Sequence, residues 1–233
     1  NLHKFYNNGK SSKQLNNRRK SFGYQVLGFG SGVSVAAAVT HGIFVFGDTG
    51  ASFTAISNLL NNSGIISADV SGVGTIRKSA GGCEYGSDKG FAGFGRTTAN
   101  SAISSTITSL GVVSSDVAAV GTARNAVSAA DFGGDKGIVA YGYTGAAYWA
   151  GSNLISNSGV VATDTGAVGT AKEGPVATEY SANRDKGIFT YGHDGSSYVT
   201  ARNLVSNVGV VAADATGAGT GRQYTYACRY STD

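Results

Sequence analysis

Short apolar runs alternate with clusters of Gly, Asn, Asp and Ser along most of the chain. Toward the C-terminus these runs are GIFTYG (187–192), SYVTARNLVSN (197–207), NVGVVAAD (207–214) and GTGRQYTYACRYS (219–231). Runs of this length, rich in β-branched and aromatic residues and bounded by turn formers, predict β-strands. Helical periodicity is weak throughout, and the β-branched content of SAISSTITSL (101–110) favours a strand there as well.

The strand pattern repeats four times, and its landmarks keep a spacing of 47 to 50 residues. Each copy contains an aromatic-Gly pair, a Gly followed by two β-branched residues, an Asp three residues later and a Gly-Thr-x-basic segment. The aromatic residues are Phe46, Phe94, Tyr141 and Tyr191, the acidic residues are Asp69, Asp116, Asp164 and Asp214, and the basic residues are Arg77, Arg124, Lys172 and Arg222. A period of this length indicates a repeat architecture.

Four strands in about 48 residues match the size of a propeller blade. A sheet this small cannot bury its faces alone, whereas stacking around an axis covers both faces and leaves only short edges. We therefore predict an all-β fold, a small β-propeller of four to five blades built from tandem repeats of about 48 residues. A right-handed β-solenoid is the main alternative, although its coils are usually shorter.

The expected organisation is a basic N-terminal arm, residues 1–20, followed by the propeller, residues 21–233. The propeller divides into a partial blade at 21–40 and repeats at 41–88, 89–135, 136–185 and 186–233. GFGSGVSVAAAVTHG (28–42) resembles the end of a copy, and the chain stops where the next copy would begin. This offset predicts that N-terminal strands complete a blade begun at the C-terminus. Four blades with an extra arm, or a fragment of a longer ring, are alternatives.

The amino-acid composition indicates a broad class of protein. Charged residues make up 14% of the chain, against about 25% in an average soluble domain, so Ser, Thr, Asn and Gly must cover much of the surface. That composition suits a particle or extracellular protein. The chain has no stretch of about 18 apolar residues, so membrane insertion is not expected.

The formal charge of +4 comes from the N-terminus, because residues 1–20 contain six basic residues and the first acidic residue of the chain is Asp48. A basic arm of this kind predicts docking onto an acidic partner, with nucleic acid the less favoured partner, and a solvated terminus is the alternative. The arm residues are Lys4, Lys10, Lys13, Arg18, Arg19 and Lys20. Cys83 and Cys228 occupy the same place in copies one and four. They are expected to lie too far apart for a disulfide, as free thiols that are buried or half-buried.

The pattern DKGIF-YG … NLVSN-GVVA-D-TG-GTAR resembles the tandem kelch-like repeats of structural and tail-fibre-type proteins of tailed bacteriophages. The likeness covers residues 41–233. It implies a virion component, on the host-facing side or decorating the particle, and it brings no catalytic residues. Copy one departs with Thr40-His41-Gly42 in place of Asp-Lys-Gly, and copy two with STITS in place of NLVSN. These departures argue against one binding site repeated in every copy.

Two recurring motifs are predicted to be structural. Asp-Lys-Gly, which starts at Asp88, Asp135 and Asp185, is interpreted as a turn in which Asp bonds its own backbone, Gly takes an unusual φ and Lys stays in water. The four repeated Asp residues are expected to bond the backbone amides of the Gly-Thr-x-basic turn that follows them, or to pair with its basic residue as an exposed ion pair. A repeated ligand site, or calcium, is the alternative, but no D-x-D-x-D-G loop is present and no metal is expected.

Catalytic motifs are weak, so the chain is not expected to be an enzyme or to hold a cofactor. GFGSG (28–32) lacks the Lys and helix of a phosphate-binding loop. The chain has three His residues in unrelated contexts and no G-x-S-x-G. The glutamates, Glu84, Glu173 and Glu179, lie in or next to final strands, so a carboxylate pair that cleaves glycosides is kept as an alternative.

The segments after the aromatic-Gly pairs vary between copies: DTGASF, RTTANS, YTGAAYW and HDGSSYV. Copies three and four combine aromatic faces with polar groups, as sugar recognition requires. The ligand-binding candidates are Tyr143, Tyr148, Trp149, His193, Asp194 and Tyr198. The alternative is that Tyr148 and Trp149 start the second strand and pack between blades.

These features together predict a non-enzymatic structural or adhesion protein, virion-associated or extracellular, that recognises host-surface glycan through one propeller face. Its expected partners are other virion proteins and a host glycan, with homo-oligomers also considered. One alternative is a virion scaffold or decoration protein that binds only particle proteins. The other is a polysaccharide-degrading enzyme built on a propeller.

Overall fold

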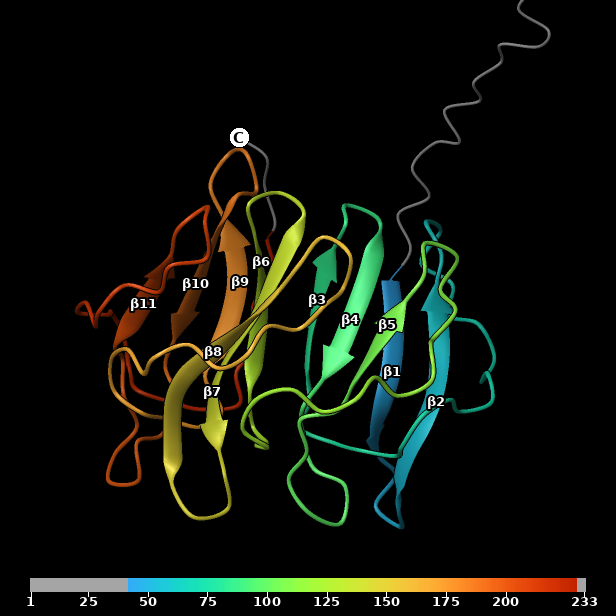
Figure 1. Cartoon of the computed structure of the whole chain (residues 1–233), viewed down its shortest axis with the longest axis horizontal. Coiled ribbons are helices and arrows are strands. Elements are labelled where there is room, and N and C mark those ends of the chain that lie inside the picture. Colours follow the sequence, from blue (N-terminus) through green and yellow to red (C-terminus); the bar gives the residue numbers. More distant parts are fainter. Residues whose placement is uncertain (1–41, 230–233) are drawn as a thin grey trace, which may run out of the picture. The chain divides into compact units, whose positions relative to one another are not determined.

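The computed structural model describes residues 42–229. The predicted arm (1–20) and partial blade (21–40) lie outside these residues. Residues 42–60 and 64–229 belong to one compact unit, and Asn61–Ser63, grouped apart from it, form a turn in which the Ser63 amide donates to Asn61 Oδ1 at 2.9 Å. Residues 42–229 contain eleven strands and no helix, which confirms the all-β prediction (Figure 1). No helix in this range could therefore cross a membrane.

The strands form four small antiparallel sheets. Sheet 1 contains β1 (Gly42–Asp48) and β2 (Phe53–Leu60), and sheet 2 contains β3 (Gly81–Tyr85), β4 (Lys89–Gly93) and β5 (Ser104–Ile107). Sheet 3 contains β6 (Ser128–Phe132), β7 (Lys136–Tyr143) and β8 (Tyr148–Ile155), and sheet 4 contains β9 (Val176–Tyr180), β10 (Lys186–Thr190) and β11 (Arg202–Val205). In sheets 2 to 4 the second strand in sequence is the central one, paired on both sides. We call the first strand of each of these sheets its inner strand.

The predicted strands appear to different extents. SAISSTITSL contains β5, so the assignment to a strand rather than a helix is confirmed. The run after the repeated Gly, predicted as a strand in NVGVVAAD (207–214), forms only the isolated bridge Val205↔Val211, and a second bridge, Arg202↔Ala215, directly follows it. Irregular backbone at residues 212–214 separates the two bridged residues, so no continuous strand forms there. The final run of copy four, at 219–229, forms no regular strand, although the equivalent runs form β3, β6 and β9.

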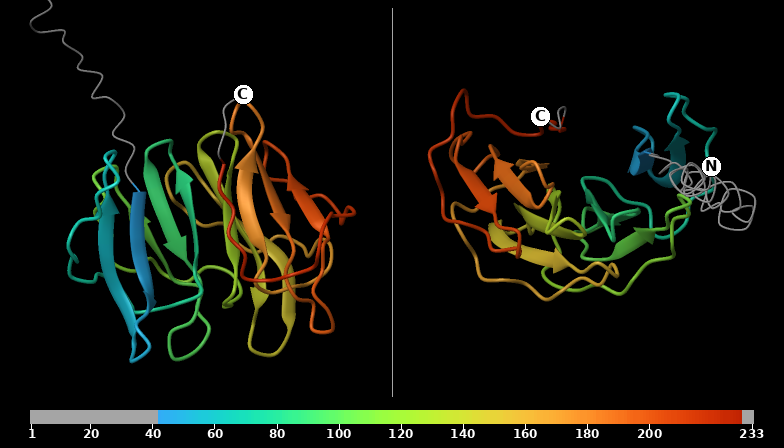
Figure 2. Two further views of the ribbon diagram at one scale, coloured as in Figure 1. Left: turned by 180° about the vertical axis from the view of Figure 1, so that it is seen from behind. Right: turned by 90° about the horizontal axis from the view of Figure 1, so that it is seen from above.

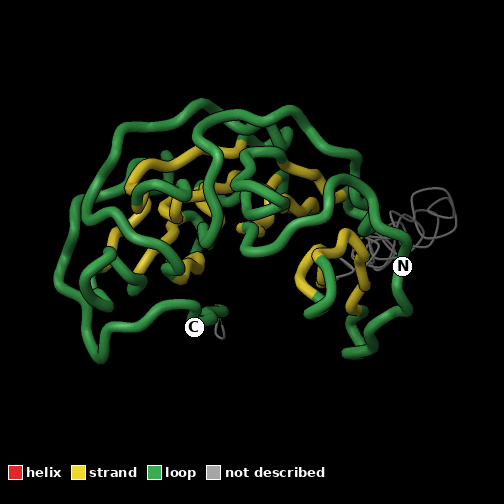
Figure 3. Tube along the Cα trace, turned by 90° about the horizontal axis from the view of Figure 1, so that it is seen from below, coloured by secondary structure: helices red, strands yellow, loops and turns green. Residues whose placement is uncertain are grey.

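Successive sheets of the unit pack face to face in chain order (Figures 2 and 3). Inner strand β3 contacts β6, and β6 contacts β9. One apolar cluster joins each neighbouring pair of sheets: Ile107 and Val113 with Val45 between sheets 1 and 2, Phe91 with Val139 between sheets 2 and 3, and Ile138 with Phe189 between sheets 3 and 4. Each small sheet therefore buries its faces against its neighbours.

The Asp-Lys-Gly segment forms the hairpin before each central strand, but the predicted geometry is partly wrong. Asp88 and Asp135 each pair with the adjacent lysine, at 2.6 Å in both cases, and the side chains of these lysines are 41% and 42% exposed. The glycine lies in the strand without a positive φ, and the left-handed residues precede it, at Gly86 and Ser87 in the first hairpin. The strand glycine is needed for space, because a Cβ at Gly137 would lie 2.5 Å from Cys83 Sγ.

The cysteines are free, as predicted, but only Cys83 is half-buried. Desolvation, reinforced by the charge of Asp131, raises the pKa of the Cys83 thiol well above its usual value. Cys228 is exposed, which corrects the prediction that both thiols are sheltered. The reason is that Cys228 belongs to the final run, which has no regular strand on either side within the described residues.

Candidate functional site: an aromatic row at the hairpin ends

The repeated aromatic-Gly pair is a backbone distortion. Phe46, Phe94, Tyr141 and Tyr191 have φ of 61° to 62°, and the glycine after each also has a positive φ. Bulky residues rarely adopt this conformation. In β1 and β7 the strand register shifts at this pair, as in a β-bulge, which redirects a side chain. The bulge turns the aromatic ring toward the basic residue of the same copy.

The basic residue of each copy stacks on this ring. The cation lies over the ring of Phe46, Phe94, Tyr141 or Tyr191 at 4.0, 4.2, 4.5 and 3.8 Å from the centroid, for Arg77, Arg124, Lys172 and Arg222 respectively. The first three cations are fully buried, with 0% of the residue exposed. A buried cation requires hydrogen-bond partners as well as a ring, and the next sheet provides them.

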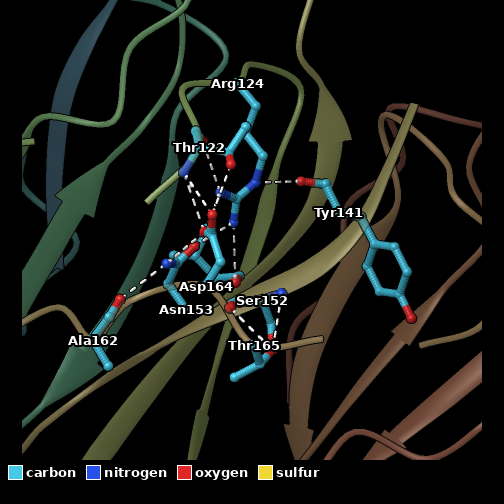
Figure 4. Close-up of polar contacts among 9 residues, drawn as sticks. Thr122, Arg124, Tyr141, Ser152, Asn153, Ala162, Asp164 and Thr165 are labelled. Carbon is cyan, nitrogen blue, oxygen red and sulfur yellow. Dashed lines mark hydrogen bonds and ion pairs between the residues drawn. The ribbon is translucent and has the colours of Figure 1, made fainter. Parts of the chain in front are cut away.

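These partners form a polar latch between consecutive copies (Figure 4). In sheet 3, Arg124 donates from Nε to the Tyr141 carbonyl at 2.8 Å and from Nη2 to Asn153 Oδ1 at 2.8 Å. Asn153 donates to Asp164 Oδ1 at 2.9 Å. Asp164 Oδ2 accepts the amide of Thr122 at 3.0 Å and its hydroxyl at 2.7 Å. We call this unit of Thr, basic residue, Asn (or Ser) and Asp the latch.

The latch recurs in the neighbouring sheets. In sheet 2, Asp116 accepts the amide and hydroxyl of Thr75 at 2.9 and 2.5 Å, and Arg77 donates to Ser105 Oγ at 2.6 Å. In sheet 4, the corresponding residues are Thr170, Lys172, Asn203 and Asp214, with Lys172 Nζ 2.8 Å from Asn203 Oδ1. The same chemistry therefore holds three successive junctions.

The latch corrects the predicted role of the repeated Asp. The sequence interpretation paired each Asp with the Gly-Thr-x-basic segment that follows it, whereas Asp116, Asp164 and Asp214 bond the segment that precedes their own sheet. The cation is also buried rather than exposed. The physical reason is that Gly-Thr-x-basic leads directly into the inner strand of the next sheet, so its neighbours in space belong to the next copy.

The latch also shifts the pKa values of its members. Desolvation lowers the pKa of Arg124 to about 10 and that of Lys172 to about 8, although Asp164 and Asp214 oppose the effect. Desolvation likewise opposes ionisation of Asp164, but hydrogen bonds from Thr122 and Asn153 outweigh it and lower the pKa of this carboxyl. Both partners are thus charged at neutral pH.

The variable segments place four aromatic side chains in series at the ends of the hairpins in sheets 3 and 4. Tyr143 pairs with Tyr148 at the last register position of β7 and β8, with ring centroids 5.3 Å apart. Tyr148 lies 5.9 Å from His193 of sheet 4, and His193 lies 5.1 Å from Tyr198. We call Tyr143, Tyr148, His193 and Tyr198 the aromatic row. Tyr198 is 57% exposed, and the other three are half-buried.

The row carries polar groups suited to hydroxyl ligands. His193 Nδ1 accepts the Gly195 amide at 3.1 Å, which assigns the proton of the neutral ring to Nε2. The Tyr143 hydroxyl donates to the Gly145 carbonyl at 3.0 Å and keeps its lone pairs. Within residues 42–229, the hydroxyls of Tyr148 and Tyr198 have no protein partner. Desolvation, followed by the charge of Glu173, raises the pKa of Tyr148, so its hydroxyl is protonated at neutral pH.

Two predicted candidates lie outside the row. Trp149 follows Tyr148 on β8 and so points to the other face of the strand, against Gly151, with its buried indole nitrogen unpaired. Tyr148 and Trp149 do start the second strand, as the alternative interpretation proposed. Asp194 accepts the amides of Ser196 and Ser197, each at 2.8 Å, and these bonds lower the pKa of its carboxyl. Asp194 therefore shapes its own turn. The six arm residues lie outside the described range.

The sequence interpretation missed three residues that border the row. Asn125 donates to Asn100 Oδ1 at 2.6 Å, and Asn100 donates to the Tyr143 carbonyl at 3.0 Å. Glu173 exchanges two backbone hydrogen bonds with His193, both at 3.0 Å. Asn125 and Glu173 each directly follow the latch cation, a position that varies in every copy. That variation was the signal that could have identified Asn125 and Glu173.

Sheet 1 carries a charged group at the same place. Asp48 and Phe53 occupy the register position of Tyr143 and Tyr148. Lys78 donates to Asp48 Oδ2 at 2.7 Å and lies 4.6 Å from the centre of the Phe53 ring. The hairpin ends thus have a shared backbone with different side chains in each copy, and only sheets 3 and 4 form a continuous aromatic series.

The other ends of the inner strands carry carboxylates around a cavity of about 140 Å³. Glu84, Asp131 and Glu179 line it, and Arg184 bonds Glu179 at 2.8 Å and lies 3.5 Å from Glu84. Desolvation raises the pKa of Asp131 to about 6. Within residues 42–229, no group of three acidic, His or Cys side chains could hold a metal ion.

The aromatic row therefore offers flat apolar faces together with hydroxyl groups and one imidazole, on two neighbouring sheets. The cavity instead offers three carboxyl groups, two of which face Arg184. Both lie at ends of the sheets, where the backbone repeats and the side chains differ. A comparison with protein-family models and with curated proteins finds no match for this chain.

Proposed function

We propose that the protein is a non-enzymatic adhesion protein that binds a carbohydrate through the aromatic row. The observation that carries the proposal is the unbroken series from Tyr143 to Tyr198, with ring centroids 5.1 to 5.9 Å apart across two sheets. Aromatic faces pack against the C–H surfaces of a sugar, and the adjacent polar groups bond its hydroxyls. The expected ligand class is a neutral cell-surface glycan.

Electrostatics favour a neutral ligand over an anionic one. Glu173 lies beside His193, and Asp194 lies in the turn that the row borders. In contrast, Lys172, the latch cation that directly precedes Glu173, is fully buried over the Tyr141 ring. A glycan rich in hydroxyl groups avoids the repulsion that a carboxylated or sulfated glycan would meet here.

We further propose that the sheets belong to a small β-propeller of the kelch-like type and that the protein is part of a bacteriophage-type virion. The face-to-face packing of the sheets, the contacts between successive inner strands and the repeated latch support the propeller. The repeat pattern of residues 41–233 supports the virion. An adhesion protein on the host-facing side of the particle would combine glycan binding with a place in the virion.

The test is binding to a glycan array, followed by affinity measurement on the best ligand. Tyr148→Ala and Tyr198→Ala are expected to weaken binding about tenfold each, since each removes a stacking face. Phe53→Ala is the matched control, because Phe53 holds the register position of Tyr148 in sheet 1. Unchanged affinity in both tyrosine variants, or release of reducing sugar ends from a polysaccharide, contradicts the proposal.

A second function, assembly with other particle proteins, is favoured by one repeated feature. The first β-branched residue after the repeated Gly is 61% to 64% exposed in all four copies, at Ile65, Val112, Val160 and Val210. Contiguous exposed apolar patches mark protein–protein contact surfaces, and in two copies a second exposed apolar side chain, Leu110 or Val208, stands two residues before this position. Val112→Ser with Val160→Ser is expected to reduce association with the particle while glycan binding persists. Equal association of this variant would contradict the second function.

A further inference from the structure

The described residues contain three complete latches and two half-latches. The first half is the pair of Asn58 and Asp69 in sheet 1. The second half is the segment Gly219-Thr220-Gly221-Arg222 near the C-terminus. The two halves carry the complementary parts of the same polar unit.

The acceptor half is already formed. Asn58 donates to Asp69 Oδ1 at 2.8 Å and to the Ser67 carbonyl at 3.1 Å. Asn153 makes the same two bonds in sheet 3, to Asp164 at 2.9 Å and to the Ala162 carbonyl at 3.0 Å. Within residues 42–229, no threonine bonds Asp69, and the residue is exposed. Its other oxygen, Oδ2, corresponds to the Asp164 oxygen that accepts the Thr122 amide and hydroxyl.

The donor half is also formed. Arg222 lies 3.8 Å from the centre of the Tyr191 ring, and its Nη1 donates to the Thr220 carbonyl at 3.0 Å. Arg124 makes the equivalent bond to the Thr122 carbonyl at 3.0 Å. The Arg222 carbonyl accepts the Gly192 amide at 2.7 Å, which anchors the segment on sheet 4. Unlike the three buried latch cations, Arg222 is exposed.

Sheet 1 lacks one strand that its neighbours have. Its strand β1 corresponds to the central strands β4, β7 and β10, but within residues 42–229 it pairs with β2 alone. In sheets 2 to 4 the missing position is filled by an inner strand that directly follows Gly-Thr-x-basic. Residues 223–229 directly follow the last such segment. The right view of Figure 2 shows sheet 1 (blue) at one end of the row of sheets and the C-terminal segment (red) at the other.

We propose that residues 219–229 of the same chain dock onto sheet 1, with residues 223–229 along the free edge of β1. Thr220 then donates its amide and hydroxyl to Asp69, and Arg222 donates to Asn58. The contact closes the row of sheets through a fourth copy of the latch. It neutralises the charge of Asp69 and buries Arg222, as in the three junctions where the same chemistry is present.

The sequence favours this segment over the other one that precedes a copy. Residues 24–31, where the repeat spacing places the segment before copy one, contain neither the threonine nor the cation that a latch uses. Residues 219–222 contain both. The covalent connection also favours the segment of the same chain over that of a second copy, because tethering gives a high effective concentration.

A double-mutant cycle in urea unfolding tests the proposal on the full chain. Asp69→Ala and Thr220→Val are each expected to lower the ratio of folded to unfolded protein about tenfold. The double variant is expected to lower this ratio no more than either single variant. Asp116→Ala, which opens a latch seen in the structure, sets the reference size. Additive effects, or no effect of Asp69→Ala while Asp116→Ala destabilises, overturn the proposal.

A cysteine pair distinguishes the source of the segment. In a Cys83→Ala, Cys228→Ser background, Asp69→Cys with Thr220→Cys is oxidised and separated without reductant. A monomer of altered mobility supports closure within one chain, whereas a disulfide-linked dimer, or no crosslink, overturns it. Both measurements are independent of the proposed glycan site, so failure of sugar binding leaves their outcome unaffected.

Discussion

Two neighbouring positions on the same strand differ in how much their surroundings vary between the copies. On β7, Tyr141 contacts two latch cations, Arg124 through its carbonyl and Lys172 through its ring, whereas Tyr143, two residues later, belongs to the aromatic row. The latch has nearly the same residues at three junctions, whereas the hairpin-end positions are aromatic in sheets 3 and 4 and charged in sheet 1. Buried polar groups require defined partners, so few residue types are acceptable there. Half-exposed positions at hairpin ends can differ between copies and so can provide specificity.

The largest expected effect comes from opening a latch. Arg124→Ala leaves Asn153 and Asp164 without their cation in a buried site, so we expect unfolding to become easier by about 3–5 kcal/mol. The measurement is urea denaturation at pH 7. Arg96→Ala removes an exposed cation of sheet 2 and is the control, with stability essentially unchanged. Similar losses in both variants would contradict the division between latch and hairpin end.

A smaller, pH-dependent effect comes from Asp131, whose carboxyl differs from that of Asp164. The folded-state pKa of Asp131 is raised to about 6, chiefly by desolvation, while that of Asp164 is lowered. Because the folded protein holds the Asp131 proton more tightly, this group reduces stability as pH rises from about 4 to 6. Asp131→Asn is therefore expected to equal wild type near pH 3.5 and to exceed it by about 2 kcal/mol at pH 7.

The measurement for Asp131 is the difference in unfolding free energy between variant and wild type across this pH range. Asp164→Asn is the matched control and should act in the opposite sense. It is less stable than wild type at pH 7, and the difference shrinks as pH falls below about 4. A flat difference curve for Asp131→Asn would contradict the raised pKa.

A milder change tests how far the latch tolerates variation. Ser105 replaces asparagine in the latch of sheet 2 and still bonds Arg77 at 2.6 Å. Asn153→Ser should therefore keep the bond to Arg124 but lose those to Asp164 and the Ala162 carbonyl, which costs about 1 kcal/mol. Thermal unfolding checks this value. A loss as large as that of Arg124→Ala would show that serine cannot replace asparagine in sheet 3.

The smallest effect on stability is expected in the row. Tyr198→Ala removes an exposed ring, so the unfolding free energy should change by less than about 0.5 kcal/mol. Glycan affinity should fall in the same variant, as proposed above. Paired denaturation and binding measurements on one preparation test this separation. A large loss of stability would assign Tyr198 to the packing of sheet 4.

Much of the fold was predictable, because strand formation is mainly local. The apolar runs bounded by turn residues became β1, β4, β7 and β10, and the four-fold repeat appears as four similar sheets. The prediction was wrong where a run depends on its neighbours. NVGVVAAD makes only single bridges, and the partner of each repeated Asp was assigned to the wrong copy.

The candidate site was predictable in composition but not in arrangement. Four of the six ligand candidates form the row, but the sequence could not show that Trp149 points to the opposite face or that Asp194 is used by its own turn. Alternation along β8 explains the first, and two local amide bonds explain the second. Asn100 was missed because its importance depends on Asn125, 25 residues away.

The amino-acid sequence by itself determined the repeat, the all-β class and the positions where copies differ, because these follow from local composition and spacing. Only the tertiary structure decided which copy supplies the partners of each basic residue and which aromatic rings meet. Both depend on the packing of one sheet against the next, which brings residues about one repeat apart into contact. The local sequence does not show these contacts, because the packing of each inner strand decides which copy lies beside the Gly-Thr-x-basic segment.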